Sequence, residues 1–202
     1  AEHMAASLPK RLGYRFERNP LVLMFVAPLF LFLVLERIPR KNAPKLERHA
    51  TWWTNLALAG MVAGMCALFG TSTYLLLQLG IISIAMGAGV WLFYVQHQFE
   101  DTYWAKNADW DFVAAALEGS SFCKLPKVLQ WFSGNIGFHH VHHLAPRIPN
   151  YNLERCHEAI AAMGAQVREI TIWEGMKSLR LNLWDEASER LVSFRQARMA
   201  MA

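Results

Sequence analysis

The sequence predicts an all-α fold in three parts: an interfacial or re-entrant segment (residues 1–52), a transmembrane helical hairpin (53–96) and a cytoplasmic helical cap (97–202) that carries a histidine cluster. Hydrophobic residues make up 54% of the chain and charged residues only 18%, below the roughly 25% typical of soluble proteins. The apolar residues crowd into positions 20–35 and 52–95, whereas charge concentrates at 10–18, at 37–48 and in the last hundred residues. This segregation indicates a bilayer-embedded region followed by one that faces water.

The hairpin rests on two apolar runs. Residues 74–95 contain no charged side chain, and residues 53–69 form a similar, slightly shorter run. About 20 apolar residues suffice to cross a bilayer as a helix. Because only residues 70–73 separate the two runs, we expect two consecutive membrane helices.

Basic residues set the expected orientation of the hairpin. The loop 37–48 carries several lysines and arginines directly before the first membrane helix, which predicts a cytoplasmic open end. His97 then emerges on that same side. Residues 21–35 are short for a span, contain Pro28 and have basic residues on both flanks. We therefore expect a broken, interfacial or re-entrant element there, with a short tilted span as the alternative.

The cap is predicted to hold three helices. Residues 131–144 form a plausible helix that stops before Pro146, and residues 153–163 form another with Asn152 placed to cap it. Thr171 and Glu174 have the spacing of a capping box. The helix that they open would be amphipathic, packing on the cap or lying on lipid headgroups, with an apolar face of Ile172, Trp173, Met176, Leu179 and Leu183.

Charge and cysteine content exclude several classes of protein. The net charge of +4 is diffuse, and no basic run is interleaved with aromatic residues, so nucleic acid is not an expected partner. Anionic lipid headgroups suit this charge better. The three cysteines form no C-x-x-C pair, which argues against a disulfide framework and for reduced thiols in the cytoplasm.

The strongest signal is a cluster of four of the eight histidines, at positions 139, 140, 142 and 143. On a helix, His139, His142 and His143 share one face because they stand at i, i+3 and i+4. Neutral imidazole is a good ligand for iron, zinc, copper or nickel. The cluster therefore predicts a metal site, and His97 is a further candidate ligand. The alternatives without a function are an adventitious metal-binding patch on the surface and an engineered histidine tag. A tag would lie at a terminus and would have no apolar neighbours.

The motif His139-x-x-His142-His143 lies between Asn135-Ile136-Gly137 and the stretch Pro146-Arg147-Ile148-Pro149-Asn150-Tyr151. This arrangement resembles the third histidine box of membrane fatty acid desaturases. Gln96-His97 after a membrane helix is similar to the additional histidine of those enzymes, and residues 118–121 and 129–132 resemble the bacterial members. Related membrane hydroxylases and ketolases surround their last box differently, and they remain the alternative within the same chemistry.

The resemblance implies an enzyme that uses O₂ and two iron ions to introduce a double bond into an acyl chain. It implies a bacterial inner-membrane location, a metal site on the cytoplasmic side, a membrane-lipid substrate, and an electron donor such as ferredoxin or a cytochrome b5-like protein. The iron ligands would be His97, His139, His142 and His143, with no catalytic residues beyond them. His140 matches a position that does not bind metal, so we expect it to support the site.

Other residues near the motif carry weaker cases. Asn135 would lie one helical turn before His139 and orient a ligand there, although helix packing is an equal alternative. Asp101, Glu100 and Glu118 could accept an imidazole N–H, although acidic residues after a membrane helix are usually just solvated. His157 and His49 are expected to be structural and headgroup-level residues.

One departure from the family pattern stands out. The family has two earlier histidine boxes, whereas only His3 and His49 precede His97 here. Four imidazoles cannot satisfy two irons in the family's manner. We therefore expect the chain to be the carboxyl-terminal part of a longer enzyme, inactive without the missing amino-terminal half. The alternative is a truncated, catalytically inactive membrane protein that only binds metal.

Overall fold

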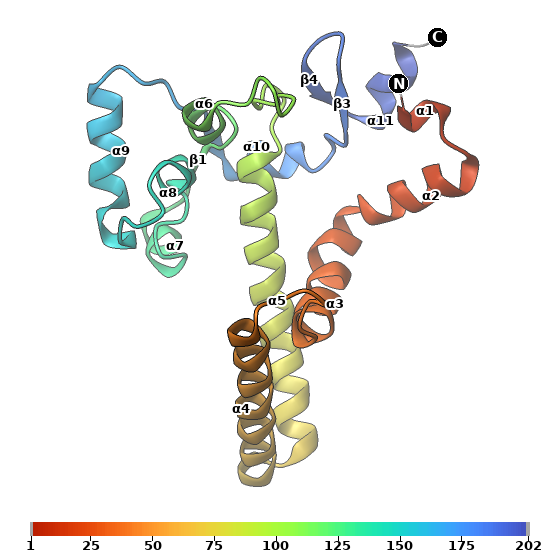
Figure 1. The fold of residues 1–202 in the computed structure, drawn as a ribbon, viewed down its shortest axis with the longest axis vertical. Coiled ribbons are helices and arrows are strands. Elements are labelled where there is room, and N and C mark those ends of the chain that lie inside the picture. Colours follow the sequence, from red (N-terminus) through yellow and green to blue (C-terminus); the bar gives the residue numbers. More distant parts are fainter. Residues whose placement is uncertain (1, 201–202) are drawn as a thin grey trace. The chain divides into compact units, whose positions relative to one another are not determined.

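The computed structural model describes residues 2–200, and it is mostly helical (Figure 1). The chain divides into two compact units, one formed by residues 7–91 and the other by residues 92–200 together with residues 2–6. The second unit contains every histidine of the predicted metal site. Each unit is described by itself below.

The first unit is built from helices in sequence order. They are α2 (Leu8–Glu17), the π-helical η1 (Val22–Val26), α3 (Ala27–Leu33), the 3₁₀ turn η2 (Leu35–Arg37), α4 (Lys45–Phe69) and the larger part of α5 (Thr71–His97). Both α4 and α5 are long and apolar enough to cross a membrane. Gly70 joins them with a φ of 84°, a conformation that glycine adopts without steric cost. The predicted pair of long apolar helices is thus confirmed.

The segment before this pair is continuous but bent. The α2 helix and the stretch Val22–Arg37 meet at 61°, which leaves either a broken span or a re-entrant element. Pro28 has no N–H to give to the carbonyl of Met24, four residues earlier. Gly87 of α5 lies directly against that carbonyl, because a Cβ added at Gly87 would stand only 3.0 Å from the Met24 oxygen. This close approach packs α5 on the irregular stretch.

The second unit mixes short helices and short strands. Its helices are α1 (Glu2–Ala5), α6 (Phe112–Leu117), α7 (Lys127–Phe132), α8 (His139–Leu144), η3 (Asn150–Asn152), α9 (Leu153–Ala162), α10 (Ile172–Ser178) and α11 (Phe194–Met199). Strand β1 (Phe122–Lys124) pairs in parallel with β2 (Glu169–Thr171), and β3 (Leu183–Asp185) pairs antiparallel with β4 (Arg190–Val192). The all-α prediction is wrong at these two sheets, because strands of three residues are too short to give an alternating pattern.

A small apolar core sits between α8 and α9. Phe138, Val141, Leu153 and Ile160 form its buried centre. The Phe138 ring stacks on the ring of Phe122 from β1 at 4.6 Å between centroids. This packing holds α8 against α9 and β1 (Figure 1).

The predicted helix 131–144 is wrong, because the chain turns in its middle. The α7 helix ends at Phe132, Gly134 and Asn135 adopt φ values of 64° and 59°, and α8 begins at His139. Gly134 adopts the left-handed conformation without a steric penalty because it has no Cβ. On α7 the usual burial is inverted, because Gln130 is buried while Trp131 and Phe132 are 73% and 76% exposed.

The other two predicted helices exist with changes at their ends. The α9 helix begins at Leu153 as expected, but the Asn152 side chain makes no capping hydrogen bond. The capping box of α10 is confirmed, because the Thr171 hydroxyl accepts from the Glu174 N–H and the Glu174 carboxylate accepts from the Thr171 N–H. The helix ends at Ser178, however, so Leu183 belongs to β3 and not to its apolar face.

Candidate metal centre

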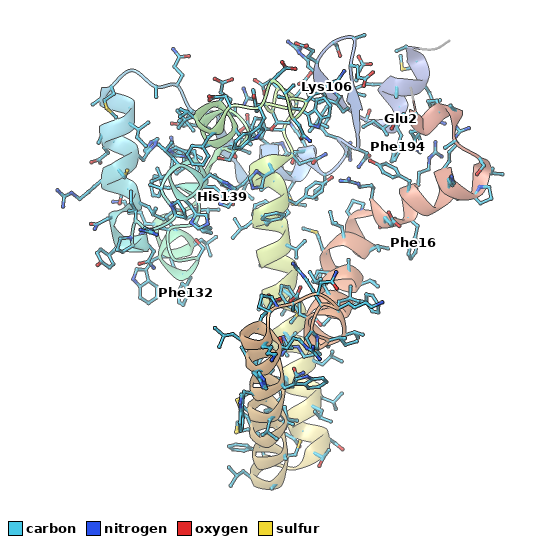
Figure 2. The ribbon with its side chains drawn as sticks, viewed as in Figure 1. Glu2, Phe16, Lys106, Phe132, His139 and Phe194 are labelled. Carbon is cyan, nitrogen blue, oxygen red and sulfur yellow. The ribbon has the colours of Figure 1, made fainter. Side chains whose placement is uncertain are left out.

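Three of the predicted ligands meet at one point. His97 lies at the end of α5, while His139 and His143 stand one turn apart on α8. The Nε2 atom of His97 is 2.9 Å from that of His139 and 3.2 Å from that of His143, and the His139 and His143 atoms are 3.1 Å apart. Figure 2 shows the His139 side chain on the face of α8 that is turned toward the end of α5.

Hydrogen bonds among the three rings cannot account for this triangle. In a neutral imidazole, Nε2 either carries a hydrogen and donates or carries a lone pair and accepts. Each of the three Nε2 atoms can only be a donor or an acceptor. At least two of the three must therefore have the same role, and these two cannot form a hydrogen bond with each other. A cation that receives a lone pair from all three nitrogens removes this conflict.

The distances also fit a single ion. Two nitrogens that bind one ion at about 2.1 Å, roughly 90° apart, stand about 3.0 Å from each other. The three Nε2 separations of 2.9, 3.1 and 3.2 Å match that spacing. The three nitrogens are therefore spaced so that they could bind the same transition-metal ion.

His97 is held in the tautomer that a metal ligand needs. Its Nδ1 lies 3.0 Å from the carbonyl oxygen of Gly119, in the loop after α6. A carbonyl only accepts, so this Nδ1 carries the hydrogen and Nε2 presents its lone pair to the cluster. Backbone carbonyls commonly orient metal-bound histidines in this way.

The surroundings keep the α8 ligands neutral. Burial and, after it in order of importance, the nearby His97, His143, His142 and His140 together lower the pKa of His139 to about 3. Burial, followed by His97 and His142, also lowers the pKa of His143. Both rings therefore offer a lone pair at neutral pH. Among the described residues, the buried Nδ1 of His139 has no hydrogen-bond partner.

His142 lies beside the triangle but outside it. Its ring centroid is 5.7 Å from that of His139, and the two rings are tilted by only 28°. The group of converging ligand atoms contains His97, His139 and His143, and it does not contain His142. His142 thus differs from the other three predicted ligands, whose ligand atoms converge on one point.

His140 points to the opposite side of α8, into the core. It is fully buried, and its Nε2 lies 3.0 Å from Nδ1 of His157 on α9. Burial, followed by His157, lowers the pKa of His140 to about 4, although the Ser121 backbone opposes this shift. His140 therefore ties α8 to α9, and His157 is a partner that the sequence alone did not single out.

The other predicted supporting residues have partners outside the histidine cluster. Asp101 forms an exposed ion pair with Arg168 at 3.9 Å, and Glu100 forms one with Arg190 at 3.7 Å. Asn135 is in the turn before α8 and donates its side-chain N–H to the carbonyl of Asn150. The carbonyl of Gly119 accepts the Nδ1–H of His97, a contact that these acidic side chains were weak candidates to make.

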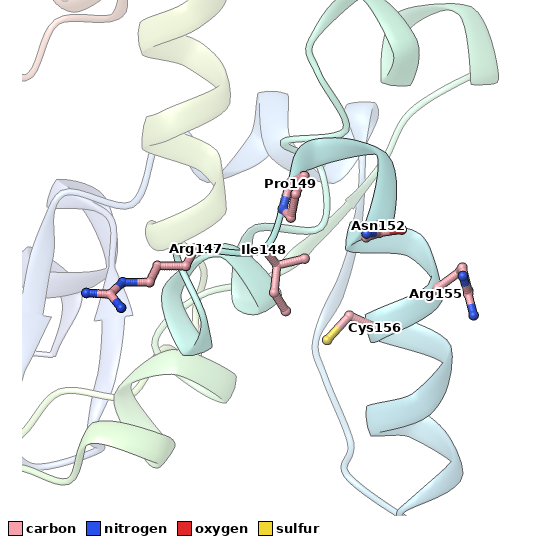
Figure 3. A pocket seen from close by; sticks show the side chains of 6 residues that line it. All are labelled: Arg147, Ile148, Pro149, Asn152, Arg155 and Cys156. Carbon is pink, nitrogen blue, oxygen red and sulfur yellow. The ribbon is translucent and has the colours of Figure 1, made fainter.

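An open hollow with a volume of about 500 Å³ lies after α8 in the chain. Its lining residues come from the loop before α9 and from α9 itself: Arg147, Ile148, Pro149, Asn152, Arg155 and Cys156. In Figure 3 the side chains of Arg147 and Arg155 extend toward opposite sides of the view. They do not converge on an anion, so the hollow adds nothing to the metal centre.

Comparisons with known proteins agree with the geometry. A family model described as fatty acid desaturase matches residues 5–174. The chain is 47% identical over 194 residues to a protein of Bacillus subtilis (strain 168) named fatty acid desaturase, covering 96% of this chain and 55% of that protein. It is 35% identical over 69 residues to a chloroplastic omega-6 fatty acid desaturase of Arabidopsis thaliana, covering 34% of this chain and 15% of that protein.

A cyanobacterial protein matches a longer stretch than the plant one. It is named sn-1 oleoyl-lipid 12-desaturase, comes from Picosynechococcus, and is 30% identical over 106 residues, covering 50% of this chain and 30% of that protein. This chain thus spans about half the length of the Bacillus relative and less of the others.

Proposed function

Because the chain belongs to the fatty acid desaturase family, we propose that it is the metal-binding part of a membrane enzyme that inserts a double bond into an acyl chain with the use of O₂. The observation that carries this proposal is the triangle of Nε2 atoms on His97, His139 and His143. The family match covers residues 5–174, and this range includes all three converging histidines.

The four predicted ligands divide into two groups. His97, His139 and His143 would together hold one iron ion, and His142 would be a ligand of a second. Iron at these positions would supply the oxygen activation needed to remove hydrogen from an unactivated carbon. His140 does not bind metal; its contact with His157 keeps α8 turned so that the ligands face α5.

The electron count requires a donor. Removing two hydrogens from neighbouring carbons of the acyl chain releases two electrons, and two more must arrive for O₂ to become two water molecules. We propose that a ferredoxin or a cytochrome b5-like protein delivers them. The neutral, partly buried imidazoles keep the ligand set intact without competing protons, because the pKa values of His139 and His143 are lowered.

Two ions need more ligands than these four imidazoles. We propose that the complete centre takes further ligands from outside these 202 residues, which agrees with the 55% coverage of the Bacillus relative. The α4 and α5 helices would cross the bilayer, and the basic loop 37–48 would keep the His97 end of α5 in the cytoplasm of a bacterial cell.

Lipid analysis tests the activity. The gene that encodes this chain, in its genomic context, is expressed in a bacterium that has no desaturase, and the acyl chains are analysed by gas chromatography and mass spectrometry. We expect new double bonds and no hydroxylated or keto products. Hydroxylated or keto products would favour a related oxygenase, and an unchanged acyl profile in cells whose purified protein contains iron would contradict the proposal.

A further inference from the structure

Gln96 stands directly before His97 in the last turn of α5, and its side chain is fully buried. Its Nε2 donates to the carbonyl of Ile136 at 2.9 Å, and Ile136 lies in the turn that leads into α8. The backbone carbonyl of Gln96 accepts from the N–H of Ser121 at 3.0 Å and from its hydroxyl at 3.3 Å. One buried residue thus connects both segments that surround His97.

The turn before α8 depends on such tethers because it is irregular. Asn135 is held to the carbonyl of Asn150, and the carbonyl of Gly137 accepts from the N–H of Cys123. Between them, the carbonyl of Ile136 is held by Gln96. Three consecutive residues are therefore fixed to three different elements, and the middle tether runs to the helix that carries His97.

We propose that Gln96 is a positioning residue that fixes the separation between His97 and the pair His139 and His143. This inference rests on the proposed metal site. His139 follows Ile136 by three residues, so a shift at Ile136 moves the first ligand of α8 relative to α5. Metal ligands must be held within about 0.5 Å of their working positions, and the buried hydrogen bond from Gln96 to Ile136 connects the two segments that carry them.

Volume alone does not explain an amide at this position. A methionine has nearly the same length and shape and carries no polar group that needs a partner. The Gln96 Oε1 is buried and has no hydrogen-bond partner among the described residues, so the amide carries an unfavourable burial cost on that side. The directional bond from Nε2 to Ile136 is the feature that an apolar side chain cannot replace.

Gln98 offers a matched control in the same turn. Its Nε2 donates to the carbonyl of Leu181 at 3.0 Å, and this carbonyl also accepts from the Tyr94 hydroxyl. Leu181 lies after α10 and contacts none of the three converging histidines through these bonds. Replacing either glutamine by methionine removes one amide donor, but only the change at Gln96 loosens the two ligand-bearing segments.

Cobalt titration of the purified full chain in detergent tests the proposal. Co²⁺ binding is followed by visible absorption for the unsubstituted chain, for Gln96→Met and for Gln98→Met, and the thermal midpoint of each metal-free protein is measured in parallel. We expect Gln96→Met to bind Co²⁺ at least about 10-fold more weakly, as for other losses of residues that orient metal ligands. Gln98→Met should stay within about twofold of the unsubstituted chain.

The outcomes separate this inference from the metal site itself. If the unsubstituted chain binds no Co²⁺, the proposed site fails. If it binds Co²⁺ and Gln96→Met binds equally well, or if both methionine variants weaken binding alike, positioning by Gln96 is overturned. Should Gln96→Met not fold, Gln96→Asn replaces it, because its amide is one methylene too short to reach Ile136 and should weaken Co²⁺ binding in the same way.

Discussion

Acidification should destabilise the metal-free chain through two buried histidines. Folding lowers the pKa of His139 to about 3 and that of His140 to about 4, from an ordinary value of 6.5. At pH values between the lowered and the ordinary pKa, these two histidines bind protons in the unfolded chain but not in the folded chain. The free energy of unfolding therefore falls as the pH drops below about 6.5. Above pH 6.5 both states are neutral at these residues and the effect vanishes.

The size of the loss in stability follows from the pKa shifts of His139 and His140. The side chains of these residues are only 5% and 0% exposed. At pH 5.5, each unfolded histidine gains about 1.4 kcal/mol from protonation, so the pair costs about 3 kcal/mol relative to pH 7.5. His143 shifts in the same direction, but its side chain is exposed and solvent screens its share.

Chemical denaturation of the chelator-treated protein at pH 7.5 and pH 5.5 measures this loss. The variant His140→Gln should reduce the loss by about half, because one of the two titrating groups is gone. His49→Gln, at an exposed position of α4, should leave the loss unchanged. Equal stability at the two pH values, or a gain on acidification, would refute the assignment of these rings as buried and neutral.

Three further predictions concern the cluster and its support. In the lipid assay, alanine at His139, His142 or His143 should abolish activity, whereas His140→Ala should retain some; equal loss at all four positions would show that the ligand assignment is wrong. Gly137→Ala should destabilise the chain by about 1–3 kcal/mol, since a Cβ there would stand 2.5 Å from the Cys123 carbonyl oxygen. The control is Gly80→Ala, because a Cβ added there would have no atom within 4 Å. Thermal unfolding of both variants should show little loss of stability for Gly80→Ala. Co²⁺ at 100 times its dissociation constant should stabilise the chain by about 2.7 kcal/mol, and His143→Ala should remove that gain if the triangle holds the ion.

The sequence predicted those features that depend on neighbouring residues. The long apolar runs became α4 and α5, and the Thr171 capping box formed as its spacing indicated. His139 and His143 share a face because both lie within α8. Local periodicity and spacing are sufficient for such features, since all participating residues lie within one or two helical turns.

Features that depend on distant contacts were missed. The contact between His140 and His157 could not be predicted, because these residues come together only when α8 packs on α9. The sequence predicts helix through the turn at Gly134 and Asn135, since the apolar residues on both sides of the turn fit one amphipathic pattern. Gly119 was missed as the partner of His97 because a backbone carbonyl leaves no signature in the sequence.

X-ray absorption at the cobalt edge tests the central claim most directly. In the Co²⁺-loaded chain, the imidazole scattering should correspond to about three nitrogens at roughly 2.1 Å from the ion, given by His97, His139 and His143. In His97→Ala this number should fall by one. A spectrum dominated by oxygen ligands, or one that does not change in His97→Ala, would contradict a metal centre built from α5 and α8.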